Sequence, residues 1–303
     1  MMTTAKSTLD LIGNTPILKL QKIVPINSAE VWLKFEAKNP TGSYKDRMAK
    51  SVLENALKRG DVTVGDTVVE YTGGSTGSSL AFVSAALGLK FVAVFSDAFS
   101  SNKQRTMEAF GATVHVEKSN GKGITPELIQ RMKTKAFELS KKGNTFYADQ
   151  FGSPDVIEGY VPMGQEIADQ IGAPIDVFCA AVGTGGAFTG AAKGLYQAGH
   201  QPDLVGLEPL QSPFLTTGEG GPHRIEGIGL GFLPPFLNLD ECSEIRAIDQ
   251  SDAFHMCRRL ATEEGLLCGP STGLNVSAAL AIASERGPDT VIVTLGCDHG
   301  SKY

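Results

Sequence analysis

Short runs rich in β-branched residues alternate with helical stretches along most of the chain, and this alternation limits the fold more than any other feature. Strands separated by helices of this length form βαβ units with parallel sheets. The run 177–182 is apolar throughout, as expected for a strand covered on both faces. We predict strands at 31–36, 67–71, 90–95, 113–117, 176–182, 204–208 and 290–295, and helices at 45–59, 77–87, 102–110, 126–142, 185–197, 251–264 and 273–284.

The chain has 303 residues, enough for two α/β lobes. A lobe boundary is expected near 148–153, after the helix that ends at residue 142. We therefore predict a smaller α/β lobe at 40–148, with residues 1–39 and 149–303 forming a larger α/β lobe.

Charge and cysteine usage exclude several classes of protein. A net charge of -6 argues against a surface for nucleic acid or an acidic membrane. The first residues lack the apolar core of a signal peptide, and no apolar run reaches membrane-spanning length. Five cysteines without CxxC spacing indicate reduced thiols rather than a disulfide framework or a zinc site. These features predict a cytoplasmic protein without a bound metal.

Glycine clusters follow several predicted strands and open the next helix. They lie at 72–77, 183–187 and 269–273, with a further cluster at 227–231. A glycine-rich turn at a helix N-terminus exposes backbone N–H groups and binds anions, although such turns are also ordinary tight connections. Hydroxyl groups at Thr72, Ser75, Thr76 and Thr184 favour two anions, a cofactor phosphate and a substrate carboxylate. The GxGxxG spacing of a dinucleotide site and the Gly-Lys-Ser/Thr of a P-loop are both missing.

Lys45 follows the turn-forming segment Asn39-Pro40-Thr41-Gly42-Ser43-Tyr44 at the start of a predicted helix. The positive end of a helix disfavours an ammonium group, whereas an imine to an aldehyde cofactor carries no such penalty. A solvated surface lysine is the alternative for this residue taken alone.

The ordered motifs resemble those of the fold-type II pyridoxal-phosphate enzymes, most closely the cysteine synthase and cystathionine β-synthase family. The resemblance runs nearly end to end, through 12–16, 39–47, 72–77, 149–151, 183–187, 208–209, 227–231, 263–266, 269–273 and 298–300. It implies the two-lobed fold related to the tryptophan synthase β subunit, with parallel sheets covered by helices on both faces. It also implies pyridoxal 5'-phosphate as cofactor and a homodimer.

The resemblance implies roles by position. Lys45 would carry the cofactor as an imine and act as general base, with the substrate-carboxylate loop in the smaller lobe and the phosphate loop in the larger. Cofactor binding would involve Ser75, Gly183, Thr184, Gly185, Gly186, Ala187, Ser271 and His299; substrate binding would involve Thr72, Gly73, Ser75, Thr76, Gln150 and Gly227. A serine hydroxyl at the pyridine nitrogen makes a weaker electron sink than an aspartate would, which favours β-elimination or β-replacement over transamination. Ser271 could equally serve as a helix N-cap.

The chain departs from the family at several of these positions. The family loop usually reads Thr-Ser-Gly-Asn-Thr-Gly, whereas Gly73 lacks the hydroxyl that would touch the substrate and Ser75 replaces the asparagine beside the cofactor's 3'-oxygen. Ala187 replaces a threonine of the phosphate loop. His299 stands where serine is usual, either titrating near the ring or as a packed polar side chain. These changes favour a specialised relative over a housekeeping cysteine synthase.

Three functions remain open on the sequence. The first is β-replacement on serine or an O-activated serine through an aminoacrylate, with a thiol, sulfide or other nucleophile. The second is a β-eliminating lyase, such as a serine or threonine dehydratase or a cysteine desulfhydrase. The third, a partner-binding homologue without activity, is disfavoured because Lys45 and both anion loops are intact.

Overall fold

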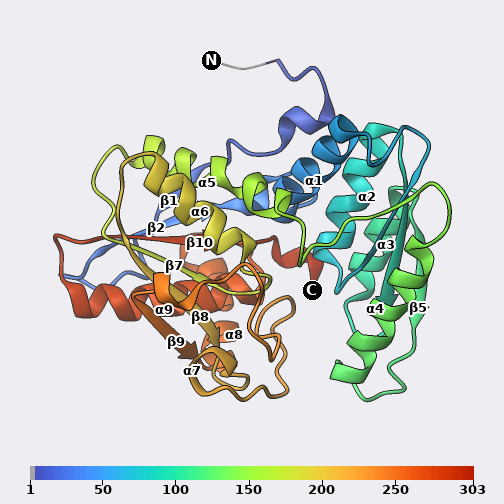
Figure 1. Ribbon diagram of the computed structural model, residues 1–303. Coiled ribbons are helices and arrows are strands. Elements are labelled where there is room, and N and C mark those ends of the chain that lie inside the picture. The colour runs from blue at the N-terminus through green and yellow to red at the C-terminus, as the bar shows by residue number, and fades with distance from the viewer. Residues whose placement is uncertain (1–3) are drawn as a thin grey trace. The chain divides into compact units, whose positions relative to one another are not determined.

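The computed structural model describes residues 4–303, which form two compact units (Figure 1). The first unit comprises residues 4–12, Lys45–Gly159 and Lys302–Tyr303, and the second comprises Gly13–Tyr44 and Tyr160–Ser301. The lobes predicted from the sequence, 40–148 and the remainder, have other bounds and stay a prediction.

A parallel four-stranded sheet forms the centre of the first unit. Its strand order is β5-β4-β3-β6, with bounds β3 (Thr67–Tyr71), β4 (Lys90–Ser96), β5 (Thr113–Glu117) and β6 (Thr145–Tyr147). Four helices belong to it: α1 (Lys45–Arg59), α2 (Ser75–Leu87), α3 (Ser101–Ala109) and α4 (Pro126–Ser140). Leu128 and Met132 of α4 are buried against Val69 and Val94 of the sheet. This apolar contact holds α4 on the sheet because burying each such side chain contributes about 1.5–3 kcal/mol.

A six-stranded sheet forms the centre of the second unit. Its order is β1-β2-β10-β7-β8-β9, with bounds β1 (Ile17–Lys19), β2 (Glu30–Phe35), β7 (Val177–Ala181), β8 (Asp203–Pro209), β9 (Glu244–Ile248) and β10 (Val291–Gly296). The edge strand β1 pairs antiparallel to β2, and the other neighbouring strands of this sheet pair in parallel. Parallel strands of this kind need helical crossovers, which the following helices supply.

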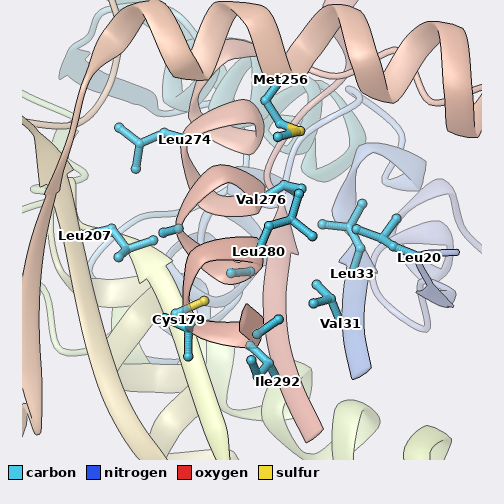
Figure 2. Close-up of a cluster of buried hydrophobic side chains, with 14 of the residues drawn as sticks. Leu20, Val31, Leu33, Cys179, Leu207, Met256, Leu274, Val276, Leu280 and Ile292 are labelled. Atoms are coloured by element: carbon cyan, nitrogen blue, oxygen red, sulfur yellow. The ribbon is translucent and has the colours of Figure 1, made fainter. Parts of the chain in front are cut away.

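Helices cover both faces of this sheet (Figure 1). Its helices are most of α5 (Asp155–Ile171), α6 (Gly186–Gln197), the short α7 (Phe214–Thr217), α8 (Gln250–Arg259) with a π-helical extension Leu260–Glu264, and α9 (Pro270–Arg286). Figure 2 shows Leu274, Val276 and Leu280 of α9 in one buried cluster with side chains from the sheet, including Val31 and Ile292. The α/β class with parallel sheets, predicted from the alternating pattern, is confirmed.

The helix α5 was missed from the sequence because it contains Gly159, Pro162 and Gly164, which disfavour an isolated helix. Tertiary packing explains both glycines, and Gly164 shows it most clearly. A Cβ atom on Gly164 would lie 2.1 Å from the Ala191 carbonyl oxygen of α6, and one on Gly194 of α6 would lie 2.1 Å from the Val161 carbonyl oxygen. The two helix backbones therefore touch, and only glycine fits at this crossing.

The prediction also missed the strands β1, β6 and β9, which are short or lie at a sheet edge. The other predicted strands and helices are present, with ends shifted by a few residues. Within residues 4–303, no helix is both long and apolar enough to cross a membrane.

Candidate active-site residues

Lys45 is the first residue of α1, and its side chain is buried, with 9% of its surface exposed. The preceding residue, Tyr44, donates its backbone N–H to the Cys297 carbonyl oxygen at 3.0 Å. The alternative of a solvated surface lysine is thus wrong. A lysine removed from bulk water at the start of a helix suits an amine that reacts covalently better than one that stays an ammonium ion.

The segment before Lys45 is held by buried polar contacts within the second unit. The Asn39 side chain accepts a hydrogen bond from the Gly13 backbone N–H at 2.8 Å and donates to the Glu36 carboxylate at 2.8 Å. Thr15 donates its hydroxyl to the same carboxylate at 2.5 Å. The early motif at residues 12–16 therefore has a structural role, since it fixes the turn that leads into α1.

The predicted carboxylate loop, 72–77, connects β3 to α2 in the first unit. The Thr72 hydroxyl oxygen accepts hydrogen bonds from the backbone N–H groups of Gly74 at 2.9 Å and Gly77 at 3.1 Å. Because both bonds use oxygen lone pairs, the hydroxyl hydrogen of Thr72 is left to donate. Gly74 has a φ of 125°, which favours glycine, and precedes Ser75, the first residue of α2.

Gln150 comes from a distant segment and contacts this loop directly. Its side-chain amide nitrogen donates to the Tyr71 carbonyl oxygen at 3.0 Å, and its side-chain oxygen accepts from the Thr76 hydroxyl at 2.8 Å. The Thr76 hydrogen is therefore engaged, and the Gln150 side chain also contacts the Glu70 carboxyl. Thr72 thus has a donor that a carboxylate would accept, and Thr76 and Tyr71 orient the Gln150 side chain beside it.

Glu70, which was not predicted from the sequence, fixes the backbone beside the loop and at Gln150. Its carboxylate oxygens accept hydrogen bonds from the backbone N–H groups of Tyr71 and Gln150, both at 2.9 Å. Complete burial raises the pKa of Glu70 to about 8, and the Asp149 carboxylate adds to the rise, against the lowering effect of its hydrogen bonds to Gln150 and Tyr71. An acidic residue two positions before the loop was the available signal in the sequence.

The predicted phosphate loop, 183–187, connects β7 to α6 in the second unit. A Cβ atom on Gly183 would lie 2.2 Å from the Gly227 carbonyl oxygen, and one on Gly185 would lie 3.0 Å from the Leu237 backbone nitrogen. Gly185 has a φ of 85° and is the N-cap of α6, followed by Gly186 and the buried Ala187. The Thr184 hydroxyl accepts from the Gly186 N–H at 3.3 Å. This glycine-rich cradle at the N-terminus of a twelve-residue helix fits a phosphate group.

Ser271 lies in the first turn of α9 and is buried. The helix N-cap is Gly269, so the alternative role of Ser271 as N-cap is wrong. Gly269 donates its N–H to the Asp298 carbonyl oxygen at 3.1 Å, and the Thr272 hydroxyl accepts from the Cys297 N–H at 3.0 Å. The start of α9 is therefore fixed against the segment that follows β10.

His299 lies in that same segment and links two predicted site segments of the second unit. It donates its backbone N–H to the Gly42 carbonyl oxygen at 2.9 Å and forms a β-bridge with Cys268. Its Nδ1 atom accepts the Ser301 backbone N–H at 3.2 Å and lies 2.7 Å from the Ser301 hydroxyl. These contacts hold the imidazole ring against the Ser301 segment.

The predicted site residues thus fall into two groups. In the first unit, Thr72, Gly73, Ser75, Thr76 and Gln150 gather at the N-terminus of α2, and Lys45 begins α1. In the second unit, Gly183 contacts Gly227, and residues 297–300 join the turn at 42–44 to the start of α9. Among residues 4–303, no group of three or more His, Cys, Asp or Glu side chains could hold a metal ion.

Comparison with known proteins agrees with these features. The family model for pyridoxal-phosphate dependent enzymes matches residues 8–298. A cysteine synthase of Staphylococcus aureus is 38% identical over 297 residues, which cover 97% of this chain and 93% of the relative. An O-ureido-L-serine synthase of Streptomyces lavendulae is 36% identical, covering 98% of this chain and 90% of the relative.

Solved structures have the same fold. A crystal structure of O-ureido-L-serine synthase matches with a TM-score of 0.92 and 35% identity, covering 99% of this chain and 94% of that chain. A hydrogen sulfide-producing enzyme from Fusobacterium nucleatum matches with a TM-score of 0.91 and 33% identity, covering 99% and 100%. The chain therefore belongs to the pyridoxal-phosphate dependent enzymes of fold type II, in the cysteine synthase family. The predicted family, fold and cofactor are confirmed.

Proposed function

We propose that this enzyme performs β-replacement on serine or an O-activated serine. The observation that carries the proposal is the nearly full-length similarity to both a cysteine synthase and an O-ureido-L-serine synthase. Cysteine and O-ureido-L-serine share the serine skeleton and differ in the group on the β-carbon. Relatives named for these two products are 38% and 36% identical to this chain.

The structure supports the residues that would hold the cofactor. The buried Lys45 would bind it through its amine, and the cradle of Gly183, Thr184, Gly185, Gly186 and Ala187 would bind its phosphate. Ser271 would contact the pyridine nitrogen, with Ser75 and His299 as further contacts. When bound, pyridoxal phosphate supplies an electron sink conjugated to the α-carbon of an amino acid.

The remaining residues would hold and convert the amino acid. Thr72 would donate a hydrogen bond to its carboxylate, supported by Gly73, Ser75, Thr76 and Gln150, while Gly227 would lie beside its amine. Lys45 would take the α-proton as the bond from the β-carbon to its oxygen substituent breaks. After the nucleophile bonds to the β-carbon, Lys45 would return the proton to the α-carbon, so the products are a new β-substituted amino acid and the released oxygen compound.

A second candidate function is a β-eliminating lyase, and one comparison favours it. The structurally similar enzyme from Fusobacterium nucleatum is described as hydrogen sulfide-producing. Elimination would use the same proton transfer by Lys45, but the product would leave before a nucleophile adds and would hydrolyse to a keto acid and ammonia.

One assay separates the two functions. The purified holoenzyme is incubated with O-acetyl-L-serine, serine or cysteine, each with and without sulfide or a thiol. We expect a new β-substituted amino acid that requires the nucleophile, with little pyruvate. Pyruvate and ammonia formed at the same rate without a nucleophile would contradict β-replacement and support the lyase.

We also propose that the protein is a cytoplasmic homodimer. The five cysteines are all free thiols, which suits a reducing compartment. The dimer rests on the family resemblance, and a sedimentation measurement of the holoenzyme tests it.

A further inference from the structure

Gly73 is restricted to glycine by a neighbouring side chain rather than by its own backbone. Its φ lies outside the left-handed region, so the backbone would accept any residue. A Cβ atom on Gly73 would, however, lie 3.0 Å from Cε1 of Phe99 and 3.3 Å from its Cδ1 and Cζ. Contacts this short require the ring to shift, so a side chain at position 73 and the ring compete for the same space.

Packing fixes the Phe99 ring in this place. Phe99 lies in the turn between β4 and α3 and donates its backbone N–H to the Ser96 carbonyl oxygen at 3.2 Å. The ring packs against the Phe95 ring, with centroids 5.6 Å apart, and against the buried cluster that includes Val69 and Val94. Phe99 remains only partly buried. These contacts place the ring beside Gly73.

The contact lies next to the donors that we assign to the substrate. Gly73 directly follows Thr72, whose hydroxyl hydrogen is left to donate, and the Thr72 oxygen binds the amides of Gly74 and Gly77. A serine at position 73 would place its Cβ against the Phe99 ring. In this chain an apolar ring fills the corresponding space.

We propose that Phe99 is a specificity-determining residue that acts together with Gly73 as one pair. The proposal rests on the proposed function of the loop as a substrate-carboxylate site. An aromatic ring offers no hydrogen bond and displaces water, so it disfavours a second anionic group close to the loop. The pair therefore selects a serine with a neutral acyl substituent, such as O-acetyl-L-serine, over one with an anionic substituent, such as O-phospho-L-serine.

The test is a double-mutant cycle with G73S, F99A and the double variant, each loaded with cofactor. We expect F99A to lower the preference for O-acetyl-L-serine over O-phospho-L-serine in kcat/KM by about tenfold, mainly through KM. G73S alone should raise KM for both substrates because the new side chain meets the ring. The double variant should recover KM with O-acetyl-L-serine to within about threefold of the native enzyme, since the ring is gone.

A matched control is F137A, which removes an exposed phenylalanine from α4 of the same unit and should leave the substrate preference unchanged. An unchanged preference in F99A, or additive effects of G73S and F99A, would overturn the proposal. If the native enzyme turned over neither substrate, the proposed function would fail separately. Dissociation constants of the two amino acids, measured from the absorbance change of the holoenzyme, would still test the pair.

Discussion

The buried carboxyl of Glu70 makes a quantitative prediction about how stability depends on pH. Its pKa is raised from 4.5 to about 8, mainly because burial disfavours the charged form. The folded state therefore holds the proton more tightly than the unfolded chain between these two values. Stability is highest below the unfolded pKa and is lost as the pH rises through the folded pKa.

The size of the effect follows from the same values. At 1.36 kcal/mol per pKa unit, the rise to about 8 corresponds to roughly 5 kcal/mol of folding free energy lost by high pH. Glu70→Gln removes this titration. The amide has only one oxygen, so either the Tyr71 or the Gln150 backbone N–H loses its acceptor, at a cost of about 1–3 kcal/mol. We expect the variant to be less stable near pH 5 and at least as stable near pH 9.

The measurement is urea unfolding of both proteins at several values from about pH 5 to about pH 9. The free energy of unfolding of the native protein minus that of Glu70→Gln should change by several kcal/mol over this range. Tyr71 and Tyr147 do not titrate in this range. Burial is the main cause that raises the pKa of both phenols, and the charge of the neighbouring Glu70 adds to the rise. Glu127→Gln is the control: the hydrogen bond to its own backbone N–H lowers the pKa of this exposed carboxyl, so its difference curve should be flat above pH 5. A flat curve for Glu70→Gln as well would refute the reasoning.

Three further predictions address the cofactor and the core. Lys45→Ala should abolish the visible absorbance band of the bound cofactor together with activity, whereas Lys58→Ala, an exposed change on the same helix, should alter neither; a retained band in Lys45→Ala would exclude Lys45 as the attachment point. Gly185→Ala should weaken pyridoxal-phosphate binding by about tenfold in a titration of the apoenzyme, because it adds a crowded Cβ to a backbone with a φ of 85°. Gly199→Ala is the control: it has the same backbone strain, with a φ of 89°, but no atom within 4 Å of the new Cβ, so it should bind pyridoxal phosphate normally. Lys34→Met should cost about 3–5 kcal/mol of unfolding free energy, because the fully buried Lys34 ammonium lies 2.7 Å from the Glu166 carboxylate. Lys19→Met, which removes the exposed pair of Lys19 with Glu30, should change the unfolding free energy little. Equal costs for Lys34→Met and Lys19→Met would contradict this account.

Much of the fold could be predicted because the relevant signals are local. The strands β3 and β5 have the predicted bounds, since each is a short β-branched run between turn residues. The helix α5 could not be predicted, because Gly164 and Pro162 argue against a helix when only neighbouring residues are considered. Gly164 is explained by its contact with α6, the next helix along the chain. This contact exists only in the folded chain.

The sequence by itself determined the α/β class, the positions of the glycine-rich turns and, through its ordered motifs, the family with its cofactor. These depend on the local order of residue types: apolar runs, helix starts and glycines at strand ends. Tertiary structure alone decided that Glu70 meets the Gln150 backbone and that Phe99 occupies the space beside Gly73. Each contact joins residues that are far apart in the chain. Packing density within the folded unit, rather than local preference, then sets which side chains can share that space.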